Sequence, residues 1–518
     1  MSNDRMDLTG RTLILVILAS VFGLSVYRAA SQSITCDEAL TYNWFLSDSG
    51  RLFWFDANNH ILHTYLAWVS TSLFGATEFT LRLPALLGAA LHLGAVFYLS
   101  RRLVRSPGWA LLLVLLLVCN PLVLDFLPAA RGYGLALAFL MWGFAFAARS
   151  LLPDAEQARH PRRLWLACSL ALALCVACNL AFLWICFSLA AILFLLTATP
   201  SRRAPPGYPP IRSLILYLGL PGPLVLLALL SPYLNKIKRA HFYVGNDRLI
   251  ETLRDLLNAS FFRAEKAVSW RAPSHPGVEV FPPWVLSLAG LALLAALVLA
   301  LAPLCRRALR EGVFALPTAD RMALLFGVPP CAALAFHVVA HRMIGLKYPL
   351  DRTAIYAVPL STLSGLLVWL RRKSPSRRSS VVVACLALLV VARYLAQLDP
   401  TYFQTWKHDA GARAEFEQMA RLVPTAAAEA VRISGPPALE PSLTFYRLTR
   451  RAGWMAPFVR GALPSPGACD FFLYDPALYS DLERQGFRMI YQDPVSGIAL
   501  ARKRRAAPEA GRLAPRSE

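Results

Sequence analysis

An adjacent pair of acids, Asp37 and Glu38, follows the first long apolar run of the chain by only a few residues. A carboxylate at such a place has water on one side and a low-dielectric region on the other, which raises carboxyl pKa values. A carboxyl group of this kind can act as a general base that takes the proton of a hydroxyl group. The residues from Thr35 to Glu38 also fit the spacing of a helix capping box, so a helix start without chemistry is the alternative.

The composition indicates a membrane protein. Hydrophobic residues make up 56% of the 518 positions and the mean hydropathy is +0.47, which excludes an ordinary soluble enzyme. The formal net charge is +22, a value that would suggest nucleic-acid binding in a soluble chain. Here the basic residues form short runs between apolar segments, which is typical of cytoplasmic loops. We therefore expect a membrane environment and no nucleic-acid partner.

Apolar segments of membrane-spanning length recur through most of the chain, and we expect about eleven spans. The apolar segment 60–74 is shorter than the ~20 residues that a span needs, so we expect an amphipathic helix at the membrane surface. This arrangement places the arginine runs between spans on the cytoplasmic side, with the N-terminus inside and the C-terminus outside. The expected spans are 12–30, 81–100, 108–126, 134–150, 164–180, 181–198, 213–231, 282–304, 322–343, 354–370 and 380–397.

The expected fold is an all-α polytopic membrane domain over residues 1–397, followed by a small extracytoplasmic α/β domain over residues 398–500. Two large outer loops, 31–80 and 232–281, interrupt the membrane domain. In the C-terminal region the polarity is ordinary, and short strand-like runs alternate with proline- and glycine-rich turns. The basic end of the chain, 501–518, is expected to be disordered.

The cysteines give little sign of a redox or metal site. Eight of the ten lie in or beside apolar segments, where thiols serve as small core side chains. Cys36 and Cys469 would face the oxidising side under this topology. A disulfide between them is the alternative to two free thiols.

A series of short motifs follows the acid pair in a definite order. These are an apolar segment opening on His60, then Arg82-Leu83-Pro84, Arg101-Arg102-Leu103, Asn120-Pro121-Leu122 and Ala130-Arg131-Gly132-Tyr133. This order resembles the GT-C superfamily of membrane glycosyltransferases, specifically the protein O-mannosyltransferase type. That group includes the bacterial lipid A aminoarabinose transferase and the lipopolysaccharide-core galacturonosyltransferases. The resemblance covers residues 12–150 by motif and the later spans by architecture.

The resemblance implies roles for particular residues. Asp37 matches the catalytic base of the family, with Glu38 as its companion. For Arg82 and Arg131 the alternative to phosphate binding is a side chain that snorkels to lipid headgroups. For His60 and His63 the alternative is a solvent-facing position. The residues matched to binding of the donor phosphate are His60, Arg82, Arg131, Tyr133 and, in a late polar motif, Arg352.

Two departures from the family pattern matter. Ile61-Leu62 stands where the family has two prolines, and Leu135 or Ala136 stands where many relatives carry a second acid. A metal site built from that second acid is therefore not expected. We expect no cofactor to be required, unless Asp37 and Glu38 share a divalent metal.

A basic and aromatic cluster opens the second outer loop. Basic residues on the outer side run against the positive-inside trend, which favours an anionic ligand such as a lipid phosphate. Attraction to anionic headgroups without a specific site is the alternative. The cluster consists of Lys236, Lys238, Arg239, His241 and Tyr243.

These features predict an integral-membrane glycosyltransferase of the bacterial inner membrane. It would transfer a hexosyl or pentosyl group from a polyprenyl-phosphate donor to a lipid, glycan or protein acceptor on the extracytoplasmic face. A direct displacement with Asp37 as base inverts the anomeric centre and needs no nucleophilic carboxylate. Two other classes stay open, a transporter or flippase of lipid-linked sugars and a membrane scaffold that acts through its C-terminal domain. The scarcity of ionisable residues within the spans of 81–150 argues against a transporter.

Overall fold

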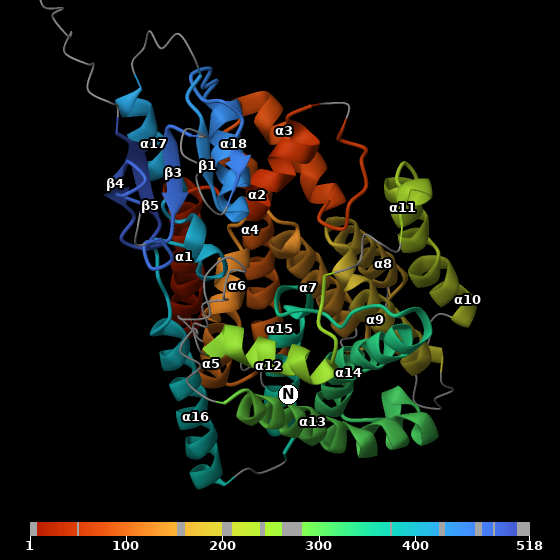
Figure 1. Cartoon of the computed structure of the whole chain (residues 1–518). Coiled ribbons are helices and arrows are strands. Elements are labelled where there is room, and N and C mark those ends of the chain that lie inside the picture. Colours follow the sequence, from red (N-terminus) through yellow and green to blue (C-terminus); the bar gives the residue numbers. More distant parts are fainter. Residues whose placement is uncertain are drawn as a thin grey trace, which may run out of the picture. The chain divides into compact units, whose positions relative to one another are not determined.

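The computed structural model describes most of the chain and divides it into two compact units (Figure 1). The first unit comprises residues 8–31 and 48–400, and the second comprises residues 32–47 and 401–504, each with the gaps given below. The short segment after the first helix therefore clusters with the C-terminal part of the chain. The described residues are 8–48, 51–152, 161–198, 210–238, 244–261, 282–372, 376–423, 430–461, 469–479 and 482–504.

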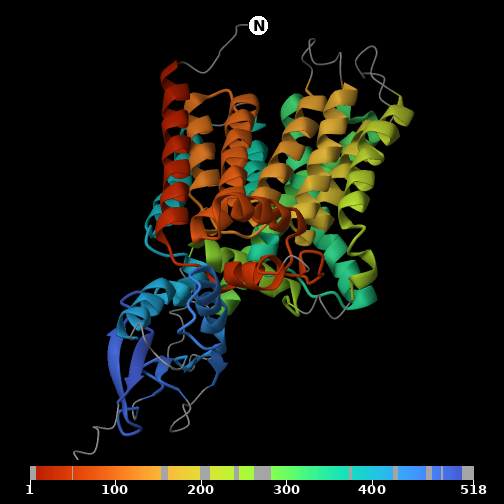
Figure 2. The ribbon, with the colours of Figure 1, turned by 90° about the horizontal axis from the view of Figure 1, so that it is seen from above.

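The first unit is helical, and its long helices stand side by side (Figure 2). Its first helices are α1 (Leu8–Ser31), α3 (Ile61–Phe74), α4 (Glu78–Leu103), α5 (Pro107–Val118), α6 (Pro121–Phe126), α7 (Tyr133–Ser150), α8 (Pro161–Cys178) and α9 (Leu183–Ala198). The later ones are α10 (Ile211–Leu214), α11 (Pro221–Leu230), α12 (Leu249–Phe261), α13 (Pro283–Glu311), α14 (Thr318–Ile344), α15 (Ala357–Leu370) and α16 (Arg377–Leu395).

Within the described residues, nine helical segments are long and apolar enough to cross a membrane. Each of the eleven predicted spans is helical, but α5, with 12 residues, and α15, with 14, are too short to be among the nine. The segment predicted at 108–126 is broken because Asn120 caps a new helix, accepting a hydrogen bond from the Val123 amide at 3.3 Å, and Pro121 opens that helix. Proline is favoured at a first helical position and disfavoured in a helix interior.

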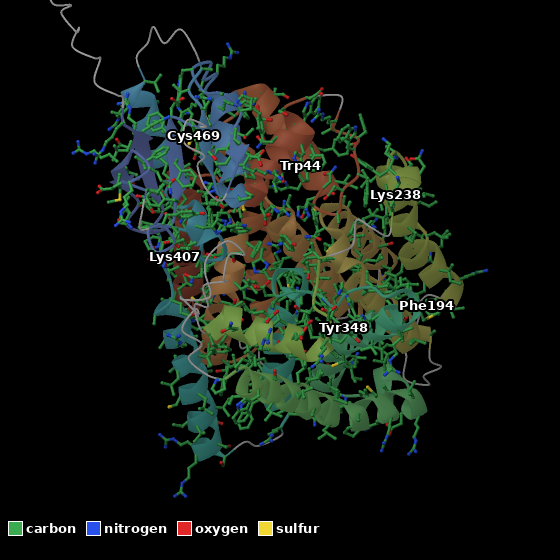
Figure 3. All side chains as sticks on the ribbon, viewed as in Figure 1. Trp44, Phe194, Lys238, Tyr348, Lys407 and Cys469 are labelled. Atoms are coloured by element: carbon green, nitrogen blue, oxygen red, sulfur yellow. The ribbon has the colours of Figure 1, made fainter. Side chains whose placement is uncertain are left out.

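Large apolar side chains are exposed on several helices of this unit. Figure 3 draws the side chains on the ribbon. On α13, Leu299 is 74% exposed and Leu293 is 62% exposed, and on α16 Leu389 is 65% exposed. Contiguous apolar surface of this kind is rare on soluble monomers and suits contact with lipid. The exposure thus agrees with the multi-pass membrane protein predicted from composition.

Helix α4 packs against α1, α3 and α7 and positions the polar residues at its first turns. The close approach of α4 to α7 depends on Gly88, since a Cβ there would lie 2.8 Å from the backbone nitrogen of Leu135. Helix α3 has 14 residues, too few for a span, and follows His60 directly. The segment 60–74 is thus absent from the nine candidate spans of the described chain.

The second unit contains a mixed five-stranded sheet with helices, which confirms the predicted α/β fold class. The strand order is β2-β1-β3-β5-β4, with β1 parallel to β2 and β3, and β5 antiparallel to β3 and β4. Its elements are α2 (Cys36–Thr41), α17 (Ala412–Leu422), β1 (Ile433–Gly435), α18 (Glu440–Thr449), β2 (Val459–Arg460), β3 (Phe471–Tyr474), β4 (Phe487–Gln492) and β5 (Ala499–Lys503).

Helix α2 packs on α18 within this unit. The ring of Tyr42 meets the ring of Phe445 edge to face, with centroids 5.2 Å apart. The hydroxyl of Tyr446 accepts a hydrogen bond from the Ile34 amide at 3.1 Å. These contacts fix the segment that carries the acid pair against the C-terminal fold.

Candidate active site

Asp37 lies in the first turn of α2, where its side chain is half-buried. Its Oδ2 atom accepts a hydrogen bond from the indole Nε1 of Trp406 at 3.1 Å. Trp406 is only 3% exposed and belongs to a 3₁₀ helix at Gln404–Asp409. A hydrogen bond from a buried ring limits the orientations of the carboxylate.

Glu38 forms the capping box that the sequence allowed. Its Oε2 accepts the Thr35 amide at 2.9 Å, and the Thr35 hydroxyl accepts the Glu38 amide at 3.2 Å. The Glu38 side chain is fully buried. The cap therefore accounts for Glu38, whereas Asp37 takes no part in it and is held by a different residue.

In the first unit, four of the residues matched to the donor phosphate come together where α3 and α7 begin and α8 ends. The His60 ring packs edge to face on Tyr133, with centroids 5.2 Å apart. Arg131 and Arg352 lie close enough to His60 to lower the pKa of its imidazole. Gly132 permits this approach, because a Cβ there would lie 2.0 Å from the carbonyl oxygen of Cys178 and 2.8 Å from Cβ of His60.

His60 and His63 are buried, at 3% and 0% exposure, which contradicts the alternative of solvent-facing positions. Burial lowers the pKa of His60 well below its usual value, and the positive charge of Arg131 lowers this pKa further. His63 and Arg352 contribute in the same direction. His60 is therefore neutral at physiological pH, where it can donate or accept a hydrogen bond but supplies no cation.

The two motif arginines are also buried, which contradicts the snorkelling alternative, since a snorkelling side chain keeps its charged head in water. Arg131 is 2% exposed, and its Nη2 donates to Asn58 Oδ1 at 3.3 Å. Arg82 is 0% exposed and donates from Nη1 to the carbonyl oxygen of Ala29, at 3.1 Å, near the end of α1. Both guanidinium groups are thus held inside the fold.

Arg28 and Asp125 form a buried ion pair in the first unit. Arg28, near the end of α1, donates from Nη2 to Asp125 Oδ1 at 2.6 Å and from Nη1 to the Leu124 carbonyl oxygen at 2.9 Å. The side chains of Arg28 and Asp125 are 2% and 7% exposed. Sequence reasoning missed this pair, although an acid inside the apolar run 108–126 was a usable signal because such residues are rare without a partner.

The basic cluster of the second outer loop is described only in part. Lys236 is exposed and donates from Nζ to the Phe53 carbonyl oxygen at 2.8 Å. Lys238 is exposed beyond the end of α11 (Figure 3). Arg239, His241 and Tyr243 lie outside the described residues. Tyr233, which precedes the cluster, is buried and donates from its hydroxyl to the Leu52 carbonyl oxygen at 3.0 Å.

Comparison with known proteins identifies the fold. A scan against protein-family models finds no match, and a search of curated sequences finds no significant relative. Among solved structures, ArnT from Cupriavidus metallidurans in the apo state is similar over 95% of this chain and 97% of its own, with 14% sequence identity and a TM-score of 0.53. At this identity the likeness shows the fold alone, and the chain has the GT-C fold that its motifs led us to expect.

Two further matches lie at lower similarity. The archaeal oligosaccharyltransferase AglB from Archaeoglobus fulgidus aligns over 97% of this chain and 76% of its own, at 12% identity and a TM-score of 0.43. The arabinofuranosyltransferase AftD from Mycobacteria aligns over 96% of this chain but 40% of its own, at 14% identity and a TM-score of 0.42. All three proteins are GT-C glycosyltransferases, but the two lower scores add nothing to the assignment of the fold.

Proposed function

We propose that this protein is a membrane glycosyltransferase that uses a polyprenyl-phosphate sugar as donor. The observation that carries the proposal is Asp37, a half-buried carboxylate held by an indole N–H six residues after α1, in a chain with the GT-C fold. The acceptor is a hydroxyl-bearing lipid, glycan or protein.

The reaction is a single displacement. Asp37 takes the proton of the acceptor hydroxyl as the new glycosidic bond forms, and the bond between the anomeric carbon and the phosphate oxygen breaks. Polyprenyl phosphate leaves with the electron pair of that bond, and the anomeric configuration inverts. Arg131 and Arg352 are the proposed cations for the developing phosphate charge, because guanidinium groups bind phosphate oxygens in bidentate fashion. Neutral His60 is proposed to donate a hydrogen bond to the same phosphate.

Glu38 has a supporting part in this proposal. Its carboxylate closes the capping box, so it holds the start of α2 and with it the backbone of Asp37. Because the Glu38 carboxylate is used in the cap, we assign the role of general base to Asp37 alone. Arg82 has a similar supporting part at the end of α1.

The extracytoplasmic location of the reaction rests on charge. The arginine runs near Arg101 and Arg371 lie at the ends of apolar helices, which favours the cytoplasm for those ends. The same rule favours the extracytoplasmic side of the bacterial inner membrane for the acid pair and the C-terminal α/β fold. Reporter fusions after Arg105, Asn59 and Leu398 test it, with a cytoplasmic signal expected only at Arg105.

The experiment that tests the function separates transfer from transport. Proteoliposomes that contain the purified chain, a polyprenyl-phosphate sugar and extracted acceptor are analysed by mass spectrometry. A transferase releases polyprenyl phosphate without its sugar and yields a glycosylated acceptor, whereas a flippase leaves the donor intact. Mass spectrometry of lipid A, glycans and surface proteins from a deletion strain then identifies the acceptor. An intact donor under conditions of measurable lipid translocation would contradict the proposal.

A further inference from the structure

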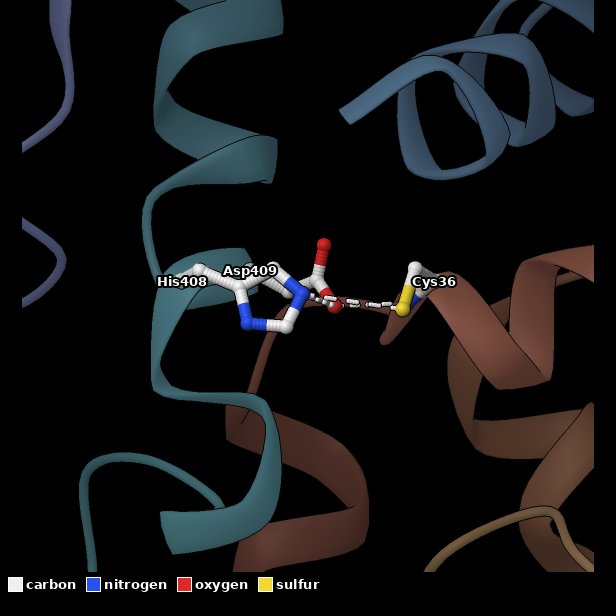
Figure 4. A group of neighbouring side chains, drawn as sticks. All are labelled: Cys36, His408 and Asp409. Carbon is white, nitrogen blue, oxygen red and sulfur yellow. Dashed lines mark hydrogen bonds and ion pairs between the residues drawn. The ribbon is translucent and has the colours of Figure 1, made fainter. Parts of the chain in front are cut away.

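Three side chains of different chemistry meet in the second unit beside the start of α2 (Figure 4). Cys36 Sγ lies 3.6 Å from His408 Nε2, and His408 Nε2 lies 3.3 Å from Asp409 Oδ2. The ligand atoms of all three residues lie within 4.8 Å of one another. A thiol, an imidazole and a carboxylate thus converge on one point from two segments of the chain that are far apart in sequence.

The spacing of these atoms suits a metal ion. Zinc sites have bond lengths of ~2.3 Å to sulfur and ~2.0–2.2 Å to nitrogen and oxygen, in tetrahedral geometry. Those values place sulfur and nitrogen ligands roughly 3.5 Å apart and nitrogen and oxygen ligands roughly 3.3 Å apart. The distances from His408 Nε2 to Cys36 Sγ and to Asp409 Oδ2 are close to these values. We propose that Cys36, His408 and Asp409 bind a zinc ion.

The chemistry of the three ligands favours zinc over the common hard cations. Calcium and magnesium prefer oxygen ligands, whereas a thiolate with an imidazole suits zinc. A thiolate at Cys36 and a carboxylate at Asp409 together balance the charge of a divalent ion, with His408 neutral. Because Asp409 is only 1% exposed, a bound cation would compensate a carboxylate that water hardly reaches.

The carboxylate of Asp409 is already oriented by neighbouring donors. The Ser442 hydroxyl donates to Oδ1 at 2.9 Å, and the Cys36 amide donates to Oδ2 at 2.6 Å. Hydrogen bonds of this kind orient metal ligands and are a regular part of protein metal sites. They come from α18 and from α2, so α18 supports the site in addition to the two segments that carry the ligands.

The proposed ion has a positioning role. Cys36 precedes Asp37, and His408 follows Trp406 by two residues. A metal bound between Cys36 and His408 would therefore hold together the two segments that form the hydrogen bond from Trp406 to Asp37. The site itself does not depend on the proposed transfer reaction, because it rests only on the geometry of its three ligands.

The first test measures metal content. The full-length protein is purified in detergent with a tag that lacks histidine, supplied with zinc, desalted and analysed by elemental mass spectrometry. We expect about one tightly bound zinc per chain, and little in Cys36→Ser or His408→Gln. Cys469→Ser, which alters another buried cysteine of the same unit, is the control and should keep the metal. Equal zinc content in wild type and Cys36→Ser would overturn the proposal, and so would wild type without zinc.

The second test does not rely on removing a ligand. Cobalt-loaded wild-type protein should show thiolate-to-cobalt charge-transfer absorption. Added zinc should displace the cobalt and abolish this absorption. Ser442→Ala keeps all three ligands and should weaken zinc affinity by about 10–100-fold in a chelator competition. In wild-type protein, zinc should also slow alkylation of Cys36 by a maleimide, whereas in Cys36→Ser zinc should leave the remaining alkylation unchanged. Absence of the cobalt band together with unprotected Cys36 would contradict a metal site.

Discussion

The indole nitrogen of Trp406 donates a hydrogen bond to the carboxylate of Asp37 across 369 residues of sequence, at 3.1 Å. Both residues belong to the second unit, so the acid after the first helix is held by the C-terminal fold. The C-terminal part of the chain therefore positions the carboxylate that we propose as the general base. This relationship gives the C-terminal fold a structural role, which is to hold the Asp37 carboxylate.

Trp406→Phe should reduce kcat while KM for the donor changes little. Phenylalanine keeps the buried aromatic contact but removes the N–H, and hydrogen bonds to charged groups contribute roughly 1.5–3 kcal/mol, or about 10–100-fold. Steady-state kinetics of sugar transfer measure this. Trp454→Phe, which alters a tryptophan packed on Phe416 in the same unit, is the control and should leave kcat unchanged. Equal activities of the two variants would rule out a positioning role for Trp406.

Asp125→Asn should destabilise the first unit strongly. The substitution leaves the Arg28 charge buried without its ion-pair partner, and breaking a buried pair costs about 3–5 kcal/mol. Thermal unfolding in detergent should show a large loss of stability for Asp125→Asn. The double variant Arg28→Met with Asp125→Leu should recover part of this stability. The exposed pair of Arg307 and Glu311 is the control, and Arg307→Met should cost at most about 1 kcal/mol. A small effect of Asp125→Asn would show that the pair contributes little.

Arg131→Lys should weaken donor use, although it keeps the positive charge. Lysine lacks the planar guanidinium fork, so both the contact to Asn58 and bidentate binding of phosphate are lost. We expect transfer to fall by about 10-fold or more, which is the size of one lost charge-assisted hydrogen bond. Arg105→Lys changes an exposed arginine and serves as the control. Wild-type kinetics from Arg131→Lys would remove Arg131 from the proposed phosphate site.

Glu415 should make the stability of the second unit depend on pH. Burial raises the pKa of this carboxyl well above its usual value, and the nearby charges of Asp493 and Asp409 raise it further. Between the unfolded pKa of ~4.3 and the raised folded pKa, the folded state binds more protons, so stability falls as pH rises through this window. Neither carboxylate oxygen of Glu415 has a hydrogen-bond partner among the described residues.

Glu415→Gln, which resembles the protonated acid, should therefore flatten the pH dependence. Its melting temperature should exceed that of wild type near pH 8 and match it near pH 4. Thermal unfolding of the full-length protein across this range is the measurement. Glu417→Gln changes an exposed neighbour on the same helix and should follow wild type. Parallel curves for Glu415→Gln and wild type would contradict this origin of the pH dependence.

The sequence predicted the helices and the fold class well because apolar runs identify membrane helices directly. It did not predict the break at Asn120, since a cap followed by proline was hidden inside a continuous apolar run. The acid at position 37 stood out because a carboxylate just beyond a membrane span is unusual. Its partner Trp406 could not be found, because one aromatic residue after the last span carries no sign of what it contacts.

The histidines show the same limit in another form. His60 and His63 open an apolar helix, and their positions alone allowed either a solvent-facing or a buried arrangement. Their burial follows from packing in three dimensions, including the approach that Gly132 permits. No local pattern contains that information. Likewise, the association of Cys36 with His408 depends on how two remote segments pack, and sequence spacing gave no reason to join them.

The central claim is that Asp37 is the general base. The most direct measurement is the single-turnover rate of sugar transfer by Asp37→Asn, with donor bound to saturation. Asparagine is nearly isosteric and its side-chain oxygen can still accept the Trp406 hydrogen bond, so folding and donor binding should be unchanged. Loss of proton transfer should reduce the rate by about 10²–10⁴-fold. A rate within a few-fold of wild type would contradict the account and leave Asp37 as part of an ordinary helix start.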